Sequence, residues 1–146
     1  MKKLLPLLVI TLLFAAGCAS SALKKESEYI AFEYEAMTRG AYKKVIVKQD
    51  TVITLNSRDT APITTGLKKG DWNKLLSALQ KVDLDKISEL KPPSTRSHVD
   101  AALAANLKVI RKDKTYQSNG FDHGNPPAEI KVLVEEILAV SALENK

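Results

Sequence analysis

The stretch YIAFEYEAM, residues 29–37, decides the fold of this chain because its apolar and polar side chains alternate. The apolar positions recur at every second residue and comprise Ile30, Phe32, Tyr34 and Ala36. Glu33 and Glu35 fall between them. A period of two residues predicts a strand that buries one face and exposes the other to solvent.

Two further strands are expected directly after this one. Arg39-Gly40 interrupts the pattern, and residues 42–49, YKKVIVKQ, resume it with β-branched side chains. After Asp50-Thr51, residues 52–56 predict a third strand. Because links this short join antiparallel neighbours, the three strands should form a meander. Residues 57–70 are polar and rich in turn residues, which predicts a loop.

A helix is expected over residues 71–82. Asp71 is a good N-cap residue. The apolar side chains after it recur at helical spacing and comprise Trp72, Leu75, Leu76, Leu79 and Val82. This spacing favours Trp72 as a core residue over Trp72 as a ligand platform. A further short turn is expected through Leu84, Ile87 and Leu90.

Two strands and a helix are expected in the last third of the chain. Pro92-Pro93 bars both helix and central strand, which predicts a loop there. The alanines of residues 101–113 favour helix, but alternation over 103–109 and a hairpin turn at 112–114 favour two strands. Asn125-Pro126 should cap the last helix, with the proline at its first position. The buried stripe of that helix comprises Ile130, Leu133, Val134, Ile137 and Leu138.

The predicted fold class is α+β. Three strands, a helix, two strands and a helix give an antiparallel sheet with the helices packed on one face. Residues 28–146 have the size of one domain and contain no internal repeat. We therefore expect a single α+β domain over this range.

The first residues have the features of a secretory signal. Lys2 and Lys3 precede an uncharged apolar run that extends from Leu4 to Ala16. A membrane span needs about 20 apolar residues, so this run is too short for one. A positive start, a short apolar core and small residues at its end are typical of a cleaved signal peptide.

Ala15-Ala16-Gly17-Cys18 resembles the lipobox of bacterial lipoproteins and departs from it at Ala15, where leucine is commoner. The resemblance implies cleavage before Cys18, a diacylglycerol on its sulfur and, usually, an acyl chain such as palmitate on its new amine. Two or more acyl chains hold a protein stably on a bilayer. The alternative is an ordinary cleaved signal with Cys18 as an unmodified residue.

This interpretation divides the chain into residues 1–17 as signal peptide, 18–27 as lipidated cysteine and flexible tether, and 28–146 as the domain. The tether is expected because its residues are small and polar and lack a hydrophobic period. No aspartate follows Cys18, and such an aspartate marks inner-membrane retention in enterobacterial lipoproteins. By this resemblance, the protein should be lipid-anchored in the cell envelope, on the outer membrane facing the periplasm.

The sequence contains few candidates for chemistry. It has no G-x-S-x-G, no phosphate-binding glycine loop, no H-E-x-x-H and no C-x-x-C. Removing residues 1–17 lowers the formal charge from +5 to +3, and the remaining lysines alternate with acids. Since no basic stripe with stacking aromatic residues is present, nucleic acid is not an expected partner.

One group of polar residues remains, in the loops 94–100 and 118–125. Its members are Arg96, His98, Asp100, Asp122 and His123. The first loop enters the fourth predicted strand and the second follows the fifth, which pairs with it, so we expect the two loops to meet. The imidazoles and carboxylates could then bind Zn²⁺, and Arg96 beside the start of the last helix could bind an anion. The competing interpretation is structural: Asp122 accepts backbone N–H groups, Asn125 caps the helix and His123 donates to a carbonyl.

The domain also resembles a group of small, uncharacterised lipoproteins of Bacteroidota. The resemblance rests on RGAY at 39–42, DWNKLL at 71–76 and SNGFDHGNPPAEIK at 118–131. It implies no particular activity. We expect a non-catalytic binding or accessory domain for an envelope protein or a small ligand, without a cofactor beyond the lipid. The alternative is a metal- or anion-binding domain, with or without enzymatic activity, that uses the two loops.

Overall fold

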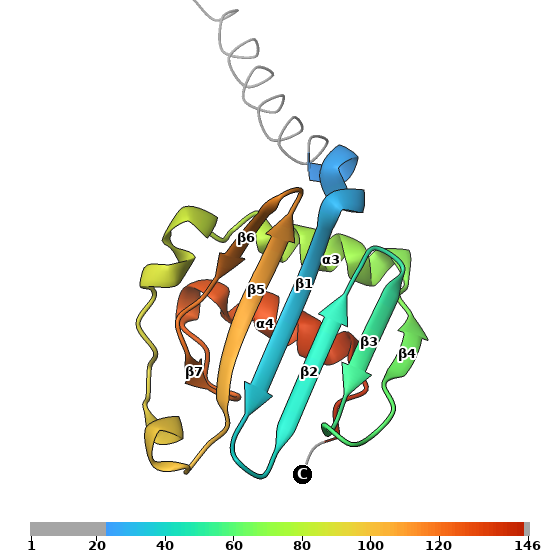
Figure 1. Cartoon of the computed structure of the whole chain (residues 1–146). Coiled ribbons are helices and arrows are strands. Elements are labelled where there is room, and N and C mark those ends of the chain that lie inside the picture. The colour runs from blue at the N-terminus through green and yellow to red at the C-terminus, as the bar shows by residue number, and fades with distance from the viewer. Residues whose placement is uncertain (1–22, 145–146) are drawn as a thin grey trace, which may run out of the picture.

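A computed structural model describes residues 23–144 and contains one antiparallel seven-stranded sheet (Figure 1). Six strands follow the order β4-β3-β2-β1-β5-β6, and β7 pairs with β5. The strands are β1 (Ile30–Met37), β2 (Tyr42–Val47), β3 (Thr51–Leu55), β4 (Ile63–Gly66), β5 (Ala104–Arg111), β6 (Lys114–Gln117) and β7 (Phe121–Asp122). The predicted meander is therefore present, with β1 at the middle of the sheet.

Two helices, α3 (Lys69–Leu79) and α4 (Ala128–Val140), cover one face of this sheet (Figure 1). Three short 3₁₀ helices connect the larger elements: η1 (Ser27–Tyr29), η2 (Leu84–Glu89) and η3 (Arg96–Val99). The predicted α+β class, with an antiparallel sheet and helices on one face, is confirmed. The short turn expected around Ile87 is η2.

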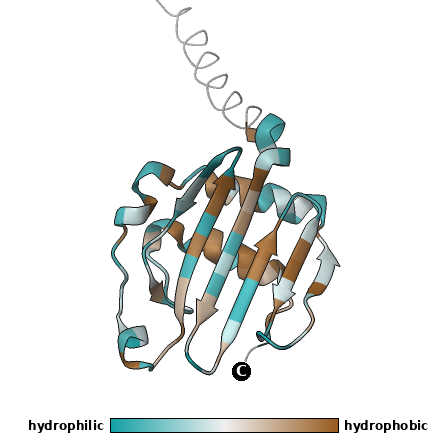
Figure 2. Ribbon diagram, in the orientation of Figure 1, coloured by the Kyte–Doolittle hydropathy of each residue, from teal (hydrophilic) through white to brown (hydrophobic). Residues whose placement is uncertain are grey.

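The alternation of β1 builds the core as the sequence predicted. Phe32 and Tyr34 are fully buried under the helices, and Phe32 meets Trp72 of α3 edge to face with ring centres 5.8 Å apart. Each such side chain stabilises the fold by roughly 1.5–3 kcal/mol through burial. On the other face, Lys44 forms an ion pair with Glu33 at 3.3 Å. Figure 2 shows the resulting bands of apolar and polar residues along the strands.

Two strands were not expected. Residues 57–70 were predicted to be a loop, but β4 lies within them and pairs with β3. The sequence did not predict β4, because its ITTG segment is exposed throughout and so has no alternating apolar pattern. β7 has only two residues, which is too short for a period, and Phe121 lies opposite Ala105 of β5.

The predicted starts of both helices were wrong. α3 begins at Lys69 with Lys68 as N-cap, and Asp71 instead lies in the first turn, where it accepts a hydrogen bond from Lys74 at 3.1 Å. α4 begins at Ala128 with Pro127 as N-cap. A residue that precedes a proline is disfavoured in the helical region, so Pro126 does not belong to the helix.

The start of the domain also differs from the expectation of a tether through residue 27. Residues 23–26 are helical, Leu23 is buried, and η1 follows directly. Glu26 accepts hydrogen bonds from Arg111 at 2.6 Å and Lys112 at 3.1 Å. The tether prediction is therefore wrong for residues 23–27, which pack on the domain.

The predicted signal peptide, residues 1–17, and Cys18 lie outside the described residues. Within residues 23–144, no helix combines the length and the apolar character that crossing a membrane requires.

Candidate functional site

The two polar loops meet, and Asp122 joins them. Its Oδ2 accepts hydrogen bonds from the Ser94 hydroxyl at 2.5 Å and the Arg96 backbone N–H at 2.8 Å. Its Oδ1 accepts from the Ser97 backbone N–H at 2.8 Å. Asp122 is only 2% exposed, so this carboxylate fixes the start of η3 from within the protein.

These hydrogen bonds stabilise the ionised form of Asp122. The Ser94 hydroxyl contributes most, followed by Ser97 and the Arg96 backbone, and together they hold the pKa of Asp122 well below its usual range. Burial raises the pKa and ranks second to the Ser94 hydroxyl, but the hydrogen bonds together outweigh it. Asn125, expected as a helix cap, instead donates from its side-chain amide to the Ser94 hydroxyl oxygen at 2.8 Å.

His123 belongs to a different contact, with the central strand. Its Nδ1 lies 2.7 Å from the hydroxyl oxygen of Tyr34, and the two rings are 5.8 Å apart at their centres. The Tyr34 hydroxyl donates to this nitrogen when Nδ1 carries no proton, and it accepts from Nδ1 in the other tautomer. Burial, and then the positive charge of Lys43, lower the pKa of His123.

The other three predicted site residues are exposed. The Arg96 guanidinium donates to the Ala101 carbonyl at 3.3 Å, within its own loop. His98 is exposed on η3, and Asp100 ends η3 in the left-handed conformation with a φ of 56°. In the part of the chain that the structure describes, no three His, Cys, Asp or Glu side chains are grouped so that they could hold a metal ion.

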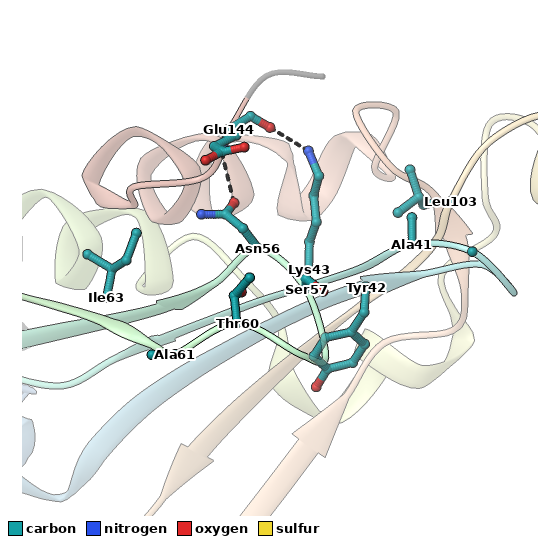
Figure 3. A pocket seen from close by; sticks show the side chains of 11 residues that line it. Ala41, Tyr42, Lys43, Asn56, Ser57, Thr60, Ala61, Ile63, Leu103 and Glu144 are labelled. Atoms are coloured by element: carbon teal, nitrogen blue, oxygen red, sulfur yellow. Dashed lines mark hydrogen bonds between the residues drawn. The ribbon is translucent and has the colours of Figure 1, made fainter.

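A cleft of about 430 Å³ lies at the end of the sheet where β1 turns into β2. We call it the distal cleft (Figure 3). Its walls come from residues 40–43, Asn56, Ser57, Thr60, Ala61, Ile63, Leu103 and Glu144. It opens because the ladder between β2 and β3 stops at Lys44 opposite Leu55. Beyond that pair, Lys43 and Asn56 turn their side chains to the C-terminal segment.

The C-terminal segment is held at the distal cleft by side chains that bind its backbone. The Asn56 amide donates to the Ala142 carbonyl at 3.1 Å, and its oxygen accepts from the Glu144 N–H at 2.9 Å. Lys43 donates to the Glu144 carbonyl at 2.6 Å, and the Thr54 hydroxyl accepts from the Ala142 N–H at 3.1 Å. This is recognition of an extended peptide backbone by polar side chains.

Tyr42, the neighbour of Lys43 in β2, borders the distal cleft from the other face of the sheet. Figure 3 shows the Tyr42 ring pointing away from Lys43 and Glu144. The guanidinium carbon of Arg58 lies 5.1 Å from the centre of this ring, a cation–π contact. Cationic, amide, hydroxyl and aromatic groups therefore surround one cleft, which suits a polar ligand.

Sequence reasoning did not identify the residues of the distal cleft, although one signal was present. Lys43 has the same parity along β2 as the buried Val45 and Val47, so it lies on the helix side of the sheet. A lysine at a position that alternation directs toward the core needs a polar partner, and the partner of Lys43 is the Glu144 carbonyl. Asn56 carries no comparable signal, since its partner is more than 80 residues away.

Comparison with protein family models, curated proteins and solved structures found no significant match to this chain.

Proposed function

We propose that this chain is an envelope lipoprotein, anchored through lipid on Cys18, whose domain is a non-catalytic binding module. The observation that carries the anchor is Ala15-Ala16-Gly17-Cys18 placed directly after a short apolar run with lysines before it. The spacing also fits a membrane anchor: cleavage before Cys18 would leave the lipidated residue only a few positions before Leu23, where the packed domain starts.

Metabolic labelling tests the anchor. Cells that express the full chain and a Cys18→Ser variant are grown with an alkyne analogue of palmitate. The full chain should carry the label and cofractionate with the outer membrane, and the variant should carry none and leave the membrane fraction. Label on neither protein would contradict the anchor, and label with inner-membrane fractionation would contradict only the expected location.

We place the binding site of this module at the distal cleft. The chain enters at the start of β1, and β1 runs the length of the sheet to the turn that borders the cleft (Figure 1). A domain held at its N-terminal end would therefore point the cleft away from the bilayer, toward ligands or proteins in the envelope. The polar lining supports a polar small ligand or an extended segment of an envelope protein.

A blocking variant tests this site. Ala61→Trp fills the distal cleft from the exposed loop between β3 and β4, and Thr64→Trp places the same side chain on the edge strand β4 as control. Full-length proteins are extracted in mild detergent and examined by native mass spectrometry. A bound molecule should accompany the wild type and the control and be absent from Ala61→Trp. Identical spectra for all three would contradict the cleft as the binding site.

The metal- or anion-binding domain is the second candidate, and the meeting of the two loops is the observation that favours it. Since both Asp122 oxygens already accept hydrogen bonds, the ligands would come from Arg96, His98, Asp100 and His123. Calorimetric titration of the full chain with Zn²⁺ and with phosphate tests it. Binding that His98→Ala with His123→Ala abolishes would favour this candidate, and the absence of binding would reject it.

A further inference from the structure

The end of the sheet where the chain enters the domain is positively charged. Four segments meet there: residues 23–29, the β2–β3 turn, the β4–α3 link and the β5–β6 turn. We call this surface the basic end, and its cations are Lys24, Lys25, Lys48, Lys68, Lys69, Arg111, Lys112 and Lys114. The acidic side chains of the same segments are Glu26, Glu28, Asp50 and Asp113.

Backbone contacts establish that these segments are neighbours. The Leu67 N–H donates to the Asp50 carbonyl at 2.8 Å, which joins the β4–α3 link to the β2–β3 turn. The Lys112 N–H donates to the Tyr29 carbonyl at 3.0 Å, which joins the β5–β6 turn to η1. Lys24 and Lys69 line one shared cavity. Figure 1 shows both turns and the first described residues at the same end of the sheet.

The cations of the basic end outnumber the acids of its four segments, and Asp83 and Asp85 add negative charge beside it, where they line a cavity with Leu23 and Arg111. All of its cations except Arg111 are exposed, and Glu26 is shared between Arg111 and Lys112. The rest of residues 23–144 holds more Asp and Glu than Lys and Arg, so the positive excess of the described domain is concentrated here. Tyr29, 56% exposed, lies beside Lys112. Aromatic side chains with a polar tip are enriched where proteins meet the headgroup region.

The proposed anchor is attached close to this surface. Only residues 19–22 separate Cys18 from the packed Leu23. Whatever their conformation, they reach at most about 18 Å, because a chain extends by no more than roughly 3.6 Å per residue. Electrostatic screening acts over about 10 Å at 0.1 M salt. A lipid on Cys18 would therefore hold the basic end within reach of the headgroup potential.

We propose that the basic end is a docking surface for anionic lipid headgroups of the bilayer that holds Cys18. This inference rests on the proposed lipid anchor. Each Lys or Arg near an anionic bilayer strengthens attachment severalfold, so several together orient the domain. The acyl chains supply one attachment and the basic end a second, which fixes the distal cleft on the side away from the bilayer.

The test uses the full lipidated chain in vesicles of phosphatidylcholine alone or of phosphatidylcholine with 30% phosphatidylglycerol. Flotation reports attachment, and acylation of lysines followed by mass spectrometry reports which ones are covered. On the anionic vesicles, labelling of Lys48, Lys68 and Lys112 should fall at least about threefold, and 0.5 M NaCl should restore it. Lys131 on α4, 59% exposed, should be labelled equally on both vesicles.

A charge-reversal pair provides the decisive variant. Lys68→Glu with Lys69→Glu should restore labelling of Lys48 and Lys112 on anionic vesicles, whereas Lys91→Glu with Lys131→Glu, which makes the same change in net charge elsewhere, should leave them protected. The first pair suits folding, since acids are favourable at the start of α3.

The outcomes separate the inference from the anchor. Flotation on both vesicles with equal lysine labelling would overturn the docking surface and leave the anchor standing. Flotation on anionic vesicles alone, lost in Lys68→Glu with Lys69→Glu, would support the surface and contradict the anchor. Flotation on neither would overturn both.

Discussion

At two places in this molecule, polar side chains bind the backbone of a distant segment. The two places differ in whether those side chains are buried or border a cavity. At the first, Asp122 is buried and accepts from a hydroxyl and from the backbone of η3. At the second, Asn56 and Lys43 bind the C-terminal segment but also border the distal cleft. A saturated, buried carboxylate stabilises the fold, whereas polar groups beside a cavity can also contact a ligand. The comparison shows that a titratable side chain does not by itself mark a binding site, because Asp122 serves only to hold two loops together.

The largest expected effect comes from removing the Asp122 carboxylate. Asp122→Ala leaves the Arg96 and Ser97 N–H groups without their acceptor in a part-buried position, which is costlier than losing a neutral hydrogen bond. The melting temperature, measured by circular dichroism, should fall on the order of 10 °C. Asp100→Asn, at an exposed position of the same loop, is the control and should shift it little. Equal shifts would show that Asp122 does not stabilise the junction.

A smaller effect is expected from Tyr34→Phe, which tests the contact between the central strand and the second loop. The variant keeps the buried ring but removes the hydroxyl that pairs with His123 Nδ1. The free energy of unfolding in urea should fall by roughly 1–3 kcal/mol. Tyr116→Phe, at a half-buried tyrosine of β6, provides the comparison and should cost less. A loss no larger than that of the control would contradict the hydrogen bond as a stabilising contact.

At the distal cleft, Asn56→Ala should act locally rather than globally. The variant removes both hydrogen bonds to the C-terminal segment but leaves the sheet intact, so global stability should change by less than about 1 kcal/mol. Amide exchange measured by mass spectrometry should accelerate in residues 142–144. Ser57→Ala, which lines the same cleft and whose hydroxyl accepts from the Asp59 N–H, should leave the exchange unchanged. Unchanged exchange in Asn56→Ala would contradict the bidentate contact.

The sequence predicted the centre of the fold well because burial leaves a period. The alternation of Ile30, Phe32, Tyr34 and Ala36 and the helical spacing after Trp72 both correspond to buried faces. The prediction failed where no period exists, in the exposed β4 and the two-residue β7. It also failed at the helix starts. For α4, either proline of Pro126-Pro127 could stand at the helix boundary, and the helix begins after the second one.

The candidate site was predicted only in part. The meeting of the two loops follows from pairing β5 with the strands after it, and the structure confirms it. The structural alternative for Asp122, as an acceptor of backbone N–H groups, is also confirmed. Tyr34 as the partner of His123 could not be read from the sequence, because the two are 89 residues apart. The distal cleft depends on where the β2–β3 ladder ends, which no local pattern specifies.

The smallest effect we predict is a pH dependence that separates the two histidines. Burial and the nearby Lys43 lower the pKa of His123 below the ordinary histidine value of about 6.5, so the unfolded chain binds a proton more readily there than the folded one. Stability contributed by neutral His123 is therefore complete above about pH 6.5 and decreases as the pH falls toward the folded pKa. The Asp122 carboxylate stays ionised in that window, because its hydrogen bonds hold its pKa well below the usual range. Urea unfolding between pH 5 and 8 should show this slope in the wild type and in His98→Gln and a flatter one in His123→Gln. An unchanged slope in His123→Gln would assign the pH dependence of stability to another group. The contact between His123 and Tyr34 would then not contribute to that dependence.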